Sequence, residues 1–308
     1  MGRSIVITGG AGFIGSHLSE MHKALGDYVV VIDNLSTSNY SLEDPADVFV
    51  PFDLSSMVEE DLELIGPILE EADLVYHLAS SVGVKHVDDD PKDSLRNSFE
   101  INNNIFPLFE YYNNRVIFAS TSEVYGNTEE AKETDTLKIG PPETLRWGYA
   151  CGKLMSEFLL KTYDFPNTIA RFFNVSGPRQ LSEFGMVLPT FIKKAKRDED
   201  IIVYGDGEQY RTFCDIRDAI EMLNILSDEE HIGEIYNIGN SNNTITMTQL
   251  AEEVVATIGS SSRIVYRDYK EDFSKEHGEI YKRKPNTDKM DQYYKSKYSI
   301  EDIIKSML

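Results

Sequence analysis

The chain has 308 residues and a formal net charge of −22 at pH 7. This length is enough for a large core in one domain or in two closely joined ones. The negative charge argues against nucleic acid or an anionic membrane as a partner. No apolar run reaches the length of a membrane span, and the chain starts directly with a strand pattern, so no signal peptide is expected. The cysteines, Cys151 and Cys214, do not resemble a disulfide framework, which favours a cytoplasmic protein. The acidic runs lack the spacing of metal ligands, so no metal site is predicted.

The first elements follow the order strand, glycine turn, helix. Ser4–Thr8 indicates a short strand, and a helical pattern extends from Ser16 to Leu25. Between them the glycines form G-x-x-G-x-x-G, a variant of the dinucleotide-binding fingerprint. Such glycines allow a tight turn, a close approach to a pyrophosphate and close helix–strand packing, and the helix N-terminus faces the phosphates. The residues predicted to contact the cofactor here are Gly9, Gly12, Phe13, Ile14 and Gly15.

The second strand, Tyr28–Asp33, ends in a carboxylate. This is the expected place for an acid that binds the hydroxyls of the adenosine ribose. A carboxylate there repels a 2′-phosphate, so the sequence favours NAD over NADP as the cofactor. Asp33 and Asn34 could also be simple turn formers, but the glycine turn in register with them favours the cofactor role.

The next two strand patterns, 48–54 and 74–80, extend the same fold. The end of the first is expected to meet the adenine, and the end of the second to lie over the cofactor. The residues predicted for these contacts are Asp53, Leu54, Ala79 and Ser80.

The pattern then alternates between helix and strand. Residues 91–112 are helical in pattern, and Pro107 is expected to kink or restart that helix. A strand over 115–120 brings Thr121 to the carboxyl edge of the sheet, where ligands bind in open parallel sheets. A helix over 147–163 and a strand over 167–172 follow. This alternation predicts an α/β fold with a Rossmann-type doubly wound parallel sheet.

The pattern changes after Asn174. Helices are expected over 187–197, before 226 and over 248–258, with strands over 201–204, 209–215, 235–239 and 263–266. Residues 271–285 are charged and are expected to be irregular. We predict an NAD-binding domain over 1–175, to which segments near 210–240 return, and a smaller α/β substrate-binding lobe over 176–308.

Tyr149 and Lys153 are spaced to share one face of a helix. An ammonium beside a phenol favours the phenolate, so the pKa of Tyr149 is predicted to fall, which makes it a base near neutral pH. Thr121 can offer a second hydroxyl to the same reacting oxygen. Such a set suits removal of a proton from an alcohol while a hydride leaves its carbon.

These motifs resemble the extended short-chain dehydrogenase/reductase family, and within it the nucleotide-sugar epimerases, dehydratases and decarboxylases. The resemblance covers nearly the whole chain and rests on six segments: 8–15, Ser120–Gly126, Tyr149–Lys153, Arg171–Asn174, 203–207 and 236–239. It implies that Tyr149 is the base, that Lys153 also holds the nicotinamide ribose, and that Thr121 bonds the sugar O4. It further implies a homodimer formed through the helix that bears Tyr149 and the helix before it.

The resemblance also implies the residues that hold a UDP-linked or other nucleotide sugar. Asn174 and Arg211 match residues on the substrate phosphates, and Arg283 matches a second arginine that closes the site. In an acidic protein a pyrophosphate needs such planar, bidentate cations. The full set of predicted substrate contacts is Asn174, Arg179, Val203, Tyr204, Arg211 and Arg283.

The reaction depends on the groups beside the 4-keto sugar. Thr121 is followed by Ser122 and Glu123, whereas the 4,6-dehydratases that the chain resembles carry Asp-Glu, and serine is a poor general acid. UDP-glucuronate decarboxylases share both the Thr-Ser-Glu segment and an Arg-Lys-Pro segment, here at Arg283. The prediction is therefore a UDP-glucuronate decarboxylase, with a UDP-glucose or UDP-glucuronate 4-epimerase next and a dehydratase third. The alternative to an enzyme is a non-catalytic scaffold that senses NAD. Such a protein should lack Tyr149 or Lys153, and both are present.

Overall fold

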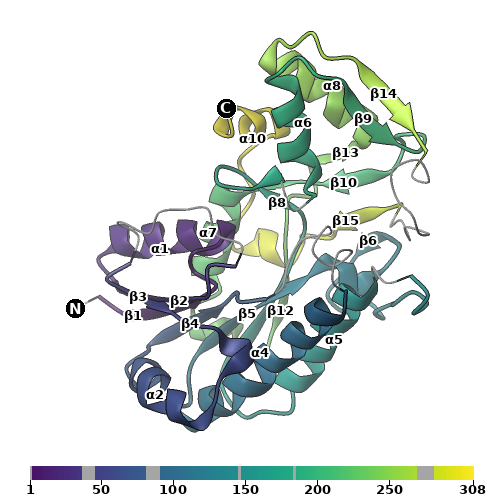
Figure 1. Cartoon of the computed structure of the whole chain (residues 1–308). Helices are drawn as coiled ribbons and strands as arrows, with labels where there is room; N and C mark the ends of the chain where they lie inside the picture. Colours follow the sequence, from purple (N-terminus) through teal and green to yellow (C-terminus); the bar gives the residue numbers. More distant parts are fainter. Residues whose placement is uncertain (1, 37–45, 81–90, 145–146, 183–184, 269–280) are drawn as a thin grey trace.

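The computed structural model describes residues 2–36, 46–80, 91–144, 147–182, 185–268 and 281–308 (Figure 1). Within these ranges seven strands form one parallel sheet in the order β12-β7-β5-β4-β1-β2-β3. The strands are β1 Ser4–Thr8, β2 Tyr28–Asp33, β3 Val48–Pro51, β4 Leu74–His77, β5 Val116–Thr121, β7 Asn167–Phe172 and β12 Ile235–Ile238. The predicted Rossmann-type α/β class is thereby confirmed.

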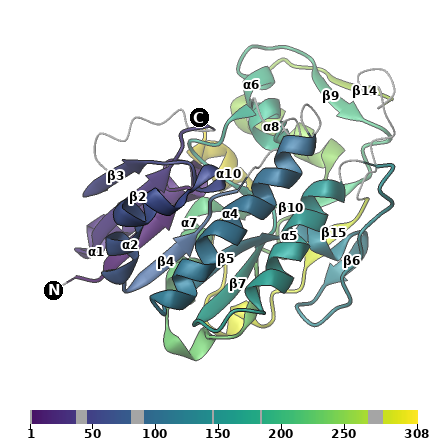
Figure 2. The same cartoon turned by 60° about the horizontal axis from the view of Figure 1, so that its bottom comes forward.

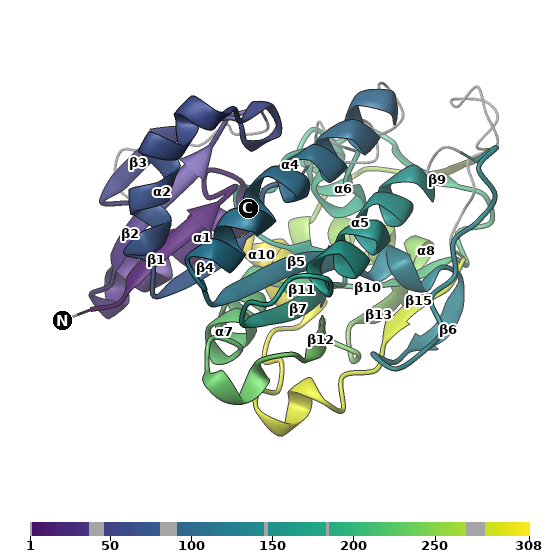
Figure 3. The same ribbon diagram turned by 90° about the horizontal axis from the view of Figure 1, so that it is seen from below.

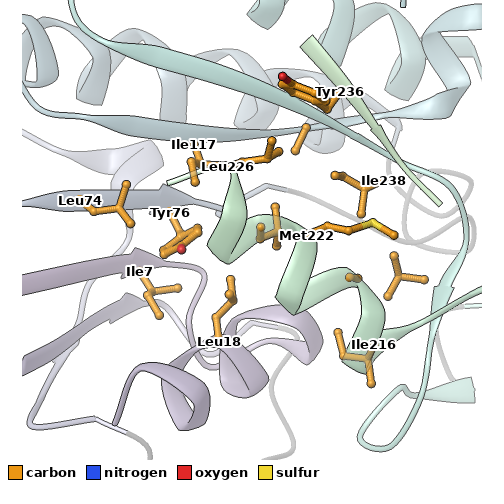
Figure 4. Close-up of a cluster of buried hydrophobic side chains, with 14 of the residues drawn as sticks. Ile7, Leu18, Leu74, Tyr76, Ile117, Ile216, Met222, Leu226, Tyr236 and Ile238 are labelled. Carbon is orange, nitrogen blue, oxygen red and sulfur yellow. The ribbon is translucent and has the colours of Figure 1, made fainter. Parts of the chain in front are cut away.

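Helices cover both faces of this sheet, as its continuous apolar strands require. One face packs against α1 (Phe13–Leu25) and α7 (Ile216–Ile225). Figure 4 shows this cluster, in which Leu18 of α1 and Met222 of α7 meet side chains of the sheet, among them Tyr76. The core of the Rossmann sheet therefore includes a helix and a strand, α7 and β12, from the second half of the chain.

The other face packs against α2 (Leu62–Glu70), α4 (Pro91–Tyr111) and α5 (Trp147–Leu160). Figures 2 and 3 show α4 and α5 lying side by side on the outside of the sheet. α4 continues through Pro107 as one helix, so of the two predicted outcomes, a kink or a restart, the restart does not occur. Among the described residues, no helix combines the length and apolar character needed to cross a membrane.

The rest of the chain builds a lobe beyond the carboxyl edge of the sheet, drawn at the top of Figure 1. A separate apolar cluster joins its helices and strands. These are α6 Val187–Ala195, α8 Met247–Ile258, α10 Ile300–Ser306, and the parallel pair β9 Ile201–Tyr204 and β14 Ile264–Arg267. The lobe also contains the antiparallel pair β10 Tyr210–Thr212 and β13 Thr244–Thr246. The predicted strand over 209–215 is therefore two short strands, β10 and β11 (Cys214–Asp215). The second of these, β11, pairs with β8 (Val175–Ser176).

One pairing joins segments far apart in sequence. After β5 the chain forms the 3-10 turn η3 (Ser122–Tyr125) and then β6 (Thr128–Ala131), which pairs in parallel with β15 (Arg283–Pro285). The predicted irregular segment 271–285 therefore ends in a strand, while residues 271–280 lie outside the described part of the chain. This pairing fixes where Arg283 enters the site.

The remaining described turns are short 3-10 helices. They are η1 Leu54–Ser56, η2 Glu59–Asp61, η5 Glu229–His231 and η6 Met290–Gln292. η1 takes up the end of the predicted third strand, because Asp53 caps it by accepting a hydrogen bond from the Ser55 amide at 2.9 Å.

Candidate active site

The end of β5 and the start of α5 bring two hydroxyls together. Thr121 is the last residue of β5, and its side chain is hydrogen-bonded to Tyr149 in the first turn of α5. The Thr121 Oγ1 also accepts from the backbone amide of Glu123 at 3.3 Å, which holds η3 against the end of the strand. One alcohol oxygen can therefore meet both hydroxyls at this edge.

Lys153 lies one turn further along α5 and is buried. Its Nζ donates to the backbone oxygen of Ala119 at 2.9 Å and lies 5.2 Å from the centre of the Phe118 ring. Burial lowers the pKa of Lys153 to about 8, although the Glu157 carboxylate acts in the opposite direction. The ammonium thus sits in an apolar site that disfavours its charge.

The pKa of Tyr149 differs from the prediction. Burial raises it above that of a free phenol, and the negative charge of Glu123 adds to the rise. The Thr121 hydrogen bond and the positive charge of Arg283 only partly oppose these effects. Lys153 does not lower the pKa as the spacing predicted, because in this structure its ammonium is directed to the Ala119 carbonyl.

Arg283 of β15 enters the site close enough for its charge to act on Tyr149, and it is 5% exposed. Its Nη2 lies 3.2 Å from the Oε1 of Glu123, and its Nη1 lies 3.5 Å from the Oγ of Ser122. Lys282 and Lys284, on either side, form exposed ion pairs with Glu129 and Glu130 of β6. β15 thus turns one cation inward and two outward, as strand alternation requires.

The glycine turn has the shape that a pyrophosphate needs. Gly9 has a φ of +71°, which favours glycine. A Cβ on Gly15 would lie 2.4 Å from the Gly9 oxygen, so only glycine lets α1 approach the turn this closely. Gly12 is the N-cap residue of α1, which begins at Phe13, three residues earlier than predicted. Phe13 and Ile14 therefore lie in the first turn of the helix, whose unbonded backbone amides point to the glycine turn.

The ends of β2 and β3 place two carboxylates beside the turn. Asp33 accepts from the amides of Ala11 at 3.0 Å and Leu35 at 2.7 Å, and burial raises its pKa. Burial alone would raise the pKa of Asp53, but hydrogen bonds from Ser55 and from the side chain of Asn34 lower it. The buried Leu54 follows it. Asp33 is therefore tied to the glycine turn itself, where a ribose beside a pyrophosphate would lie.

The end of β4 offers a further fit for a cofactor. The Ser80 hydroxyl is buried and has no hydrogen-bond partner among the described residues, and such a group needs one from a ligand or water. The Ala79 amide donates to Thr8 Oγ1 at 3.3 Å, and Thr8 in turn bonds His77 at 2.7 Å. Burial lowers the pKa of His77 to about 4, so this histidine is a neutral structural link.

The predicted substrate contacts other than Arg283 fall into three places. Asn174 has a φ of +35°, and its side-chain amide donates to the backbone oxygen of Thr212 at 3.0 Å. Thr212 follows Arg211 in β10. The Nη1 of Arg211 donates to the backbone oxygen of Tyr210 at 2.9 Å. The Val203 side chain is buried in the core of the lobe, and the Tyr204 backbone oxygen accepts from the Gln209 side chain at 2.8 Å.

Arg179 lies elsewhere. Its Nη1 donates to Ser16 Oγ at 3.2 Å, and its Nη2 pairs with Glu20, both on α1. These contacts bring it beside the helix that faces the predicted cofactor rather than beside Arg283.

Sequence analysis missed a buried carboxylate behind Lys153. Glu157 is 5% exposed and forms a two-bond ion pair with Arg171 of β7, at 3.0 and 2.6 Å. The signal was available, since Glu157 continues the four-residue spacing of Tyr149 and Lys153 along one face of the helix.

The parallel sheet and this carboxyl edge define a dinucleotide-binding α/β enzyme of the Rossmann type. Residues 5–239 match the model of the NAD dependent epimerase/dehydratase family, and the chain belongs to that family. The predictions of the family and of NAD as the cofactor are confirmed.

Relatives and solved structures cover most of the chain. It is 34% identical to the UDP-N-acetyl-alpha-D-glucosaminuronate decarboxylase of Bacillus cytotoxicus, over 94% of this chain and 91% of that protein. It is also 34% identical to UDP-glucuronic acid decarboxylase 4 of Arabidopsis thaliana over 92% of this chain, and spans 62% of that longer protein. The UDP-glucose 4-epimerase of Thermotoga maritima, solved with UDP-glucose, superposes with a TM-score of 0.85 at 25% identity, over 98% of this chain and 96% of that one.

Proposed function

We propose that this protein is an NAD-dependent decarboxylase of a UDP-linked uronic acid, with UDP-glucuronate as the first candidate substrate. The observation that carries the proposal is the buried Arg283, held by Glu123 and Ser122 at the edge where Tyr149 meets Thr121. A guanidinium in this position suits a carboxylate on the sugar. The two decarboxylases at 34% identity support the same reaction.

The residues on the edge divide the work of C4 oxidation. Tyr149 accepts the proton of the C4 hydroxyl while Thr121 hydrogen-bonds the same oxygen. Because the Tyr149 pKa is raised in this structure, the phenol needs nearby positive charge to ionise, and Lys153 is the cation one turn away. Bound NAD would supply the hydride acceptor for C4. The glycine turn, Asp33 and Ser80 are the residues proposed to hold it.

The 4-keto sugar is a β-keto acid and loses its carboxylate readily. The C5–C6 bond breaks, carbon dioxide leaves, and the electron pair remains on the sugar as an enolate spread over C5, C4 and the C4 oxygen. Arg283 balances the negative charge that moves from the carboxylate to this enolate. Glu123 orients the ring or carries the proton that C5 then takes up, while Asn174 and Arg211 bind the diphosphate.

A UDP-sugar 4-epimerase is the second candidate, since the Thermotoga enzyme shares the fold over nearly the whole chain. It would use Tyr149, Thr121 and Lys153 alone, and would leave Arg283 as a phosphate clamp. A 4,6-dehydratase has less support, because Ser122 replaces the acid that this reaction needs.

A proton NMR time course of the protein with NAD and UDP-glucuronate tests the proposal, with UDP-N-acetylglucosaminuronate as the second substrate. A new UDP-pentose anomeric signal with one equivalent of carbon dioxide is expected from UDP-glucuronate. Arg283→Gln should abolish it, whereas Lys284→Gln, which removes a half-buried cation on the other face of the same strand, should not. A new hexuronate with its carboxylate retained would mean that the protein is an epimerase.

We further infer a homodimer formed through α4 and α5. Exposed apolar side chains gather on these adjacent helices, and Phe158 is 69% exposed. The others are Leu95, Phe99, Tyr111 and Met155. Such a stripe on two neighbouring helices suits a four-helix interface with a second copy.

We also propose the division into an NAD-binding part, residues 1–175 with α7 and β12, and a substrate lobe from the rest. The packing of α7 and β12 in the core of the sheet supports it. A cytoplasmic location is inferred from Cys151 and Cys214, which are both free thiols.

A further inference from the structure

A chain of four buried polar side chains runs behind the candidate active site. Its members are Glu157 of α5, Arg171 of β7, Tyr125 of η3 and Asn237 of β12, and each is 5% exposed or less. None of them belongs to the set that we propose to contact substrate or cofactor. Each comes from a different element, so the chain joins parts of the fold that the sheet alone does not connect.

One end of this chain holds the helix that carries Tyr149 and Lys153. Glu157 lies one turn beyond Lys153 and accepts the hydroxyl of Ser120, the residue before Thr121 in β5. Its two oxygens also accept from Arg171 at 3.0 and 2.6 Å. The position of α5 relative to the end of β5 therefore depends on this carboxylate.

The other end holds the two segments that make the Arg283 cluster. The Tyr125 hydroxyl accepts from Arg171 Nη1 and donates to Asn237 Oδ1, both at 2.8 Å. The Asn237 amide group then donates to the oxygen of Ala131 in β6 at 2.9 Å and to that of Asn286 at 3.1 Å. Asn286 follows directly after β15, so Tyr125 links η3 to the strand that carries Arg283.

The direction of these bonds is determined by their chemistry. Arg171 can only donate, so the Tyr125 oxygen must accept from it and is left with its proton for Asn237. Burial raises the pKa of Tyr125, which keeps that proton in place across the working pH range. The Arg171 guanidinium also lies 4.8 Å from the centre of the Tyr125 ring. The Tyr125 hydroxyl therefore has a single hydrogen-bonding arrangement, which suits a residue that holds two segments at a defined distance.

Buried ion pairs of this kind are poor sources of stability, because their desolvation offsets their attraction. The surroundings of Tyr125 are apolar and include Val124 and Phe173, so packing alone could have filled this space. The chain of buried polar side chains adds a defined spacing between the elements that it joins.

We propose that Tyr125 is a positioning residue, which sets the place of Ser122 and Glu123 relative to Arg283 and so governs the step that follows C4 oxidation. The proposal rests on the proposed function for the meaning of that step. Tyr125 does not touch the reacting atoms. It acts through η3 on one side and through Asn237 and the end of β15 on the other.

The test compares Tyr125→Phe with Tyr236→Phe. Tyr236 is also 2% exposed, and its hydroxyl makes a 2.8 Å hydrogen bond to His231, but it packs in the cluster on the other side of the sheet. The two variants lose the same atom from similarly buried sites. Urea unfolding of both variants shows whether they remain folded and how far their stabilities match.

With UDP-glucuronate, Tyr125→Phe is expected to lower kcat roughly 10- to 100-fold with little change in KM, the range for a small misplacement of reacting groups. NAD affinity should be unchanged. Enzyme-bound NADH, measured at 340 nm, should accumulate during turnover because C4 oxidation continues while the next step slows. Tyr236→Phe should show neither effect. Equal kcat and equal bound NADH in the two variants would overturn the proposal.

Amide hydrogen exchange gives a readout that does not depend on the reaction. In Tyr125→Phe, exchange should quicken at Asn286, whose amide donates to Ala131 at 2.8 Å, and at Asn237, relative to Tyr236→Phe. If the wild-type protein decarboxylates no UDP-uronate, the proposed function fails, and this exchange alone decides the positioning role. Should Tyr125→Phe not fold, Asn237→Ser breaks the same link and is expected to give the same pattern. Unchanged exchange in the folded variants would refute the link.

Discussion

Replacing Lys153 by methionine is expected to stabilise the protein while abolishing its turnover. Lys153 is buried, and burial lowers its pKa from 10.5 to about 8. This difference corresponds to a penalty of about 3 kcal/mol for keeping the ammonium in the fold at neutral pH. Methionine has a similar length and no charge, but it loses the 2.9 Å hydrogen bond to Ala119, a loss of about 1 kcal/mol. The net gain is about 2 kcal/mol.

The sign of the pH dependence follows from which state holds the proton. Between pH 8 and 10.5 the unfolded chain keeps the Lys153 proton and the folded chain has lost it, so the wild-type stability rises with pH in that window. Below pH 8 both states are protonated, and the penalty is fully present. The advantage of Lys153→Met should therefore be largest near pH 7 and should vanish towards pH 10.

Urea unfolding at pH 7, 8.5 and 10 measures this difference. The control is Lys196→Met, an exposed lysine whose Nζ also donates to a backbone carbonyl, that of Met307 at 3.4 Å, and to the terminal oxygen of Leu308 at 2.7 Å. It should change stability by no more than about 0.5 kcal/mol at any of these pH values. The reasoning is refuted if Lys153→Met is less stable than wild type at pH 7, or if its advantage does not shrink as the pH rises.

Three further predictions concern the cofactor, the base and the assembly. Gly15→Ala should weaken NAD binding at least roughly tenfold in a fluorescence titration, because the new Cβ would lie 2.4 Å from the Gly9 oxygen; an unchanged Kd would contradict the role of the turn. Tyr149→Phe should lower kcat by roughly 10²-fold or more with NAD affinity retained, whereas full turnover would favour a non-catalytic sensor. Phe158→Asp should convert a dimer into a folded monomer in light scattering, since this side chain is 69% exposed on α5; a dimer that persists would place the interface elsewhere.

The parts of the site that rest on local backbone geometry were accessible from the sequence. The glycine turn between β1 and α1 needs only a few neighbouring residues, and so its place in the fold could be predicted from their spacing. Asp33 at the end of β2 follows from the same unit. Tyr149 and Lys153 share a face of α5 because any helix puts residues four apart on one side.

Other features depended on chain segments that meet only in the folded protein. The β6–β15 pairing joins residues about 150 positions apart, and no local periodicity signals it, so the segment around Arg283 was predicted to be irregular. The bonds of Tyr125 are also made by distant residues, Arg171 and Asn237. Neither link leaves a pattern in the residues beside it.

The pKa values show the same division. The spacing alone predicts that Lys153 lowers the pKa of Tyr149, because a positive charge one turn away is the only influence on that pKa that the sequence reveals. The tertiary structure adds burial and the nearby Glu123 carboxylate, which raise the pKa of Tyr149, and it directs the Lys153 ammonium to a backbone carbonyl instead. The sequence by itself determined the fold class, the glycine turn and the placing of Tyr149 and Lys153 on one helix face, because these follow from the order of the elements and from short-range spacing. Only the tertiary structure decided their charge, their burial and the position of Arg283, since these depend on where distant segments pack.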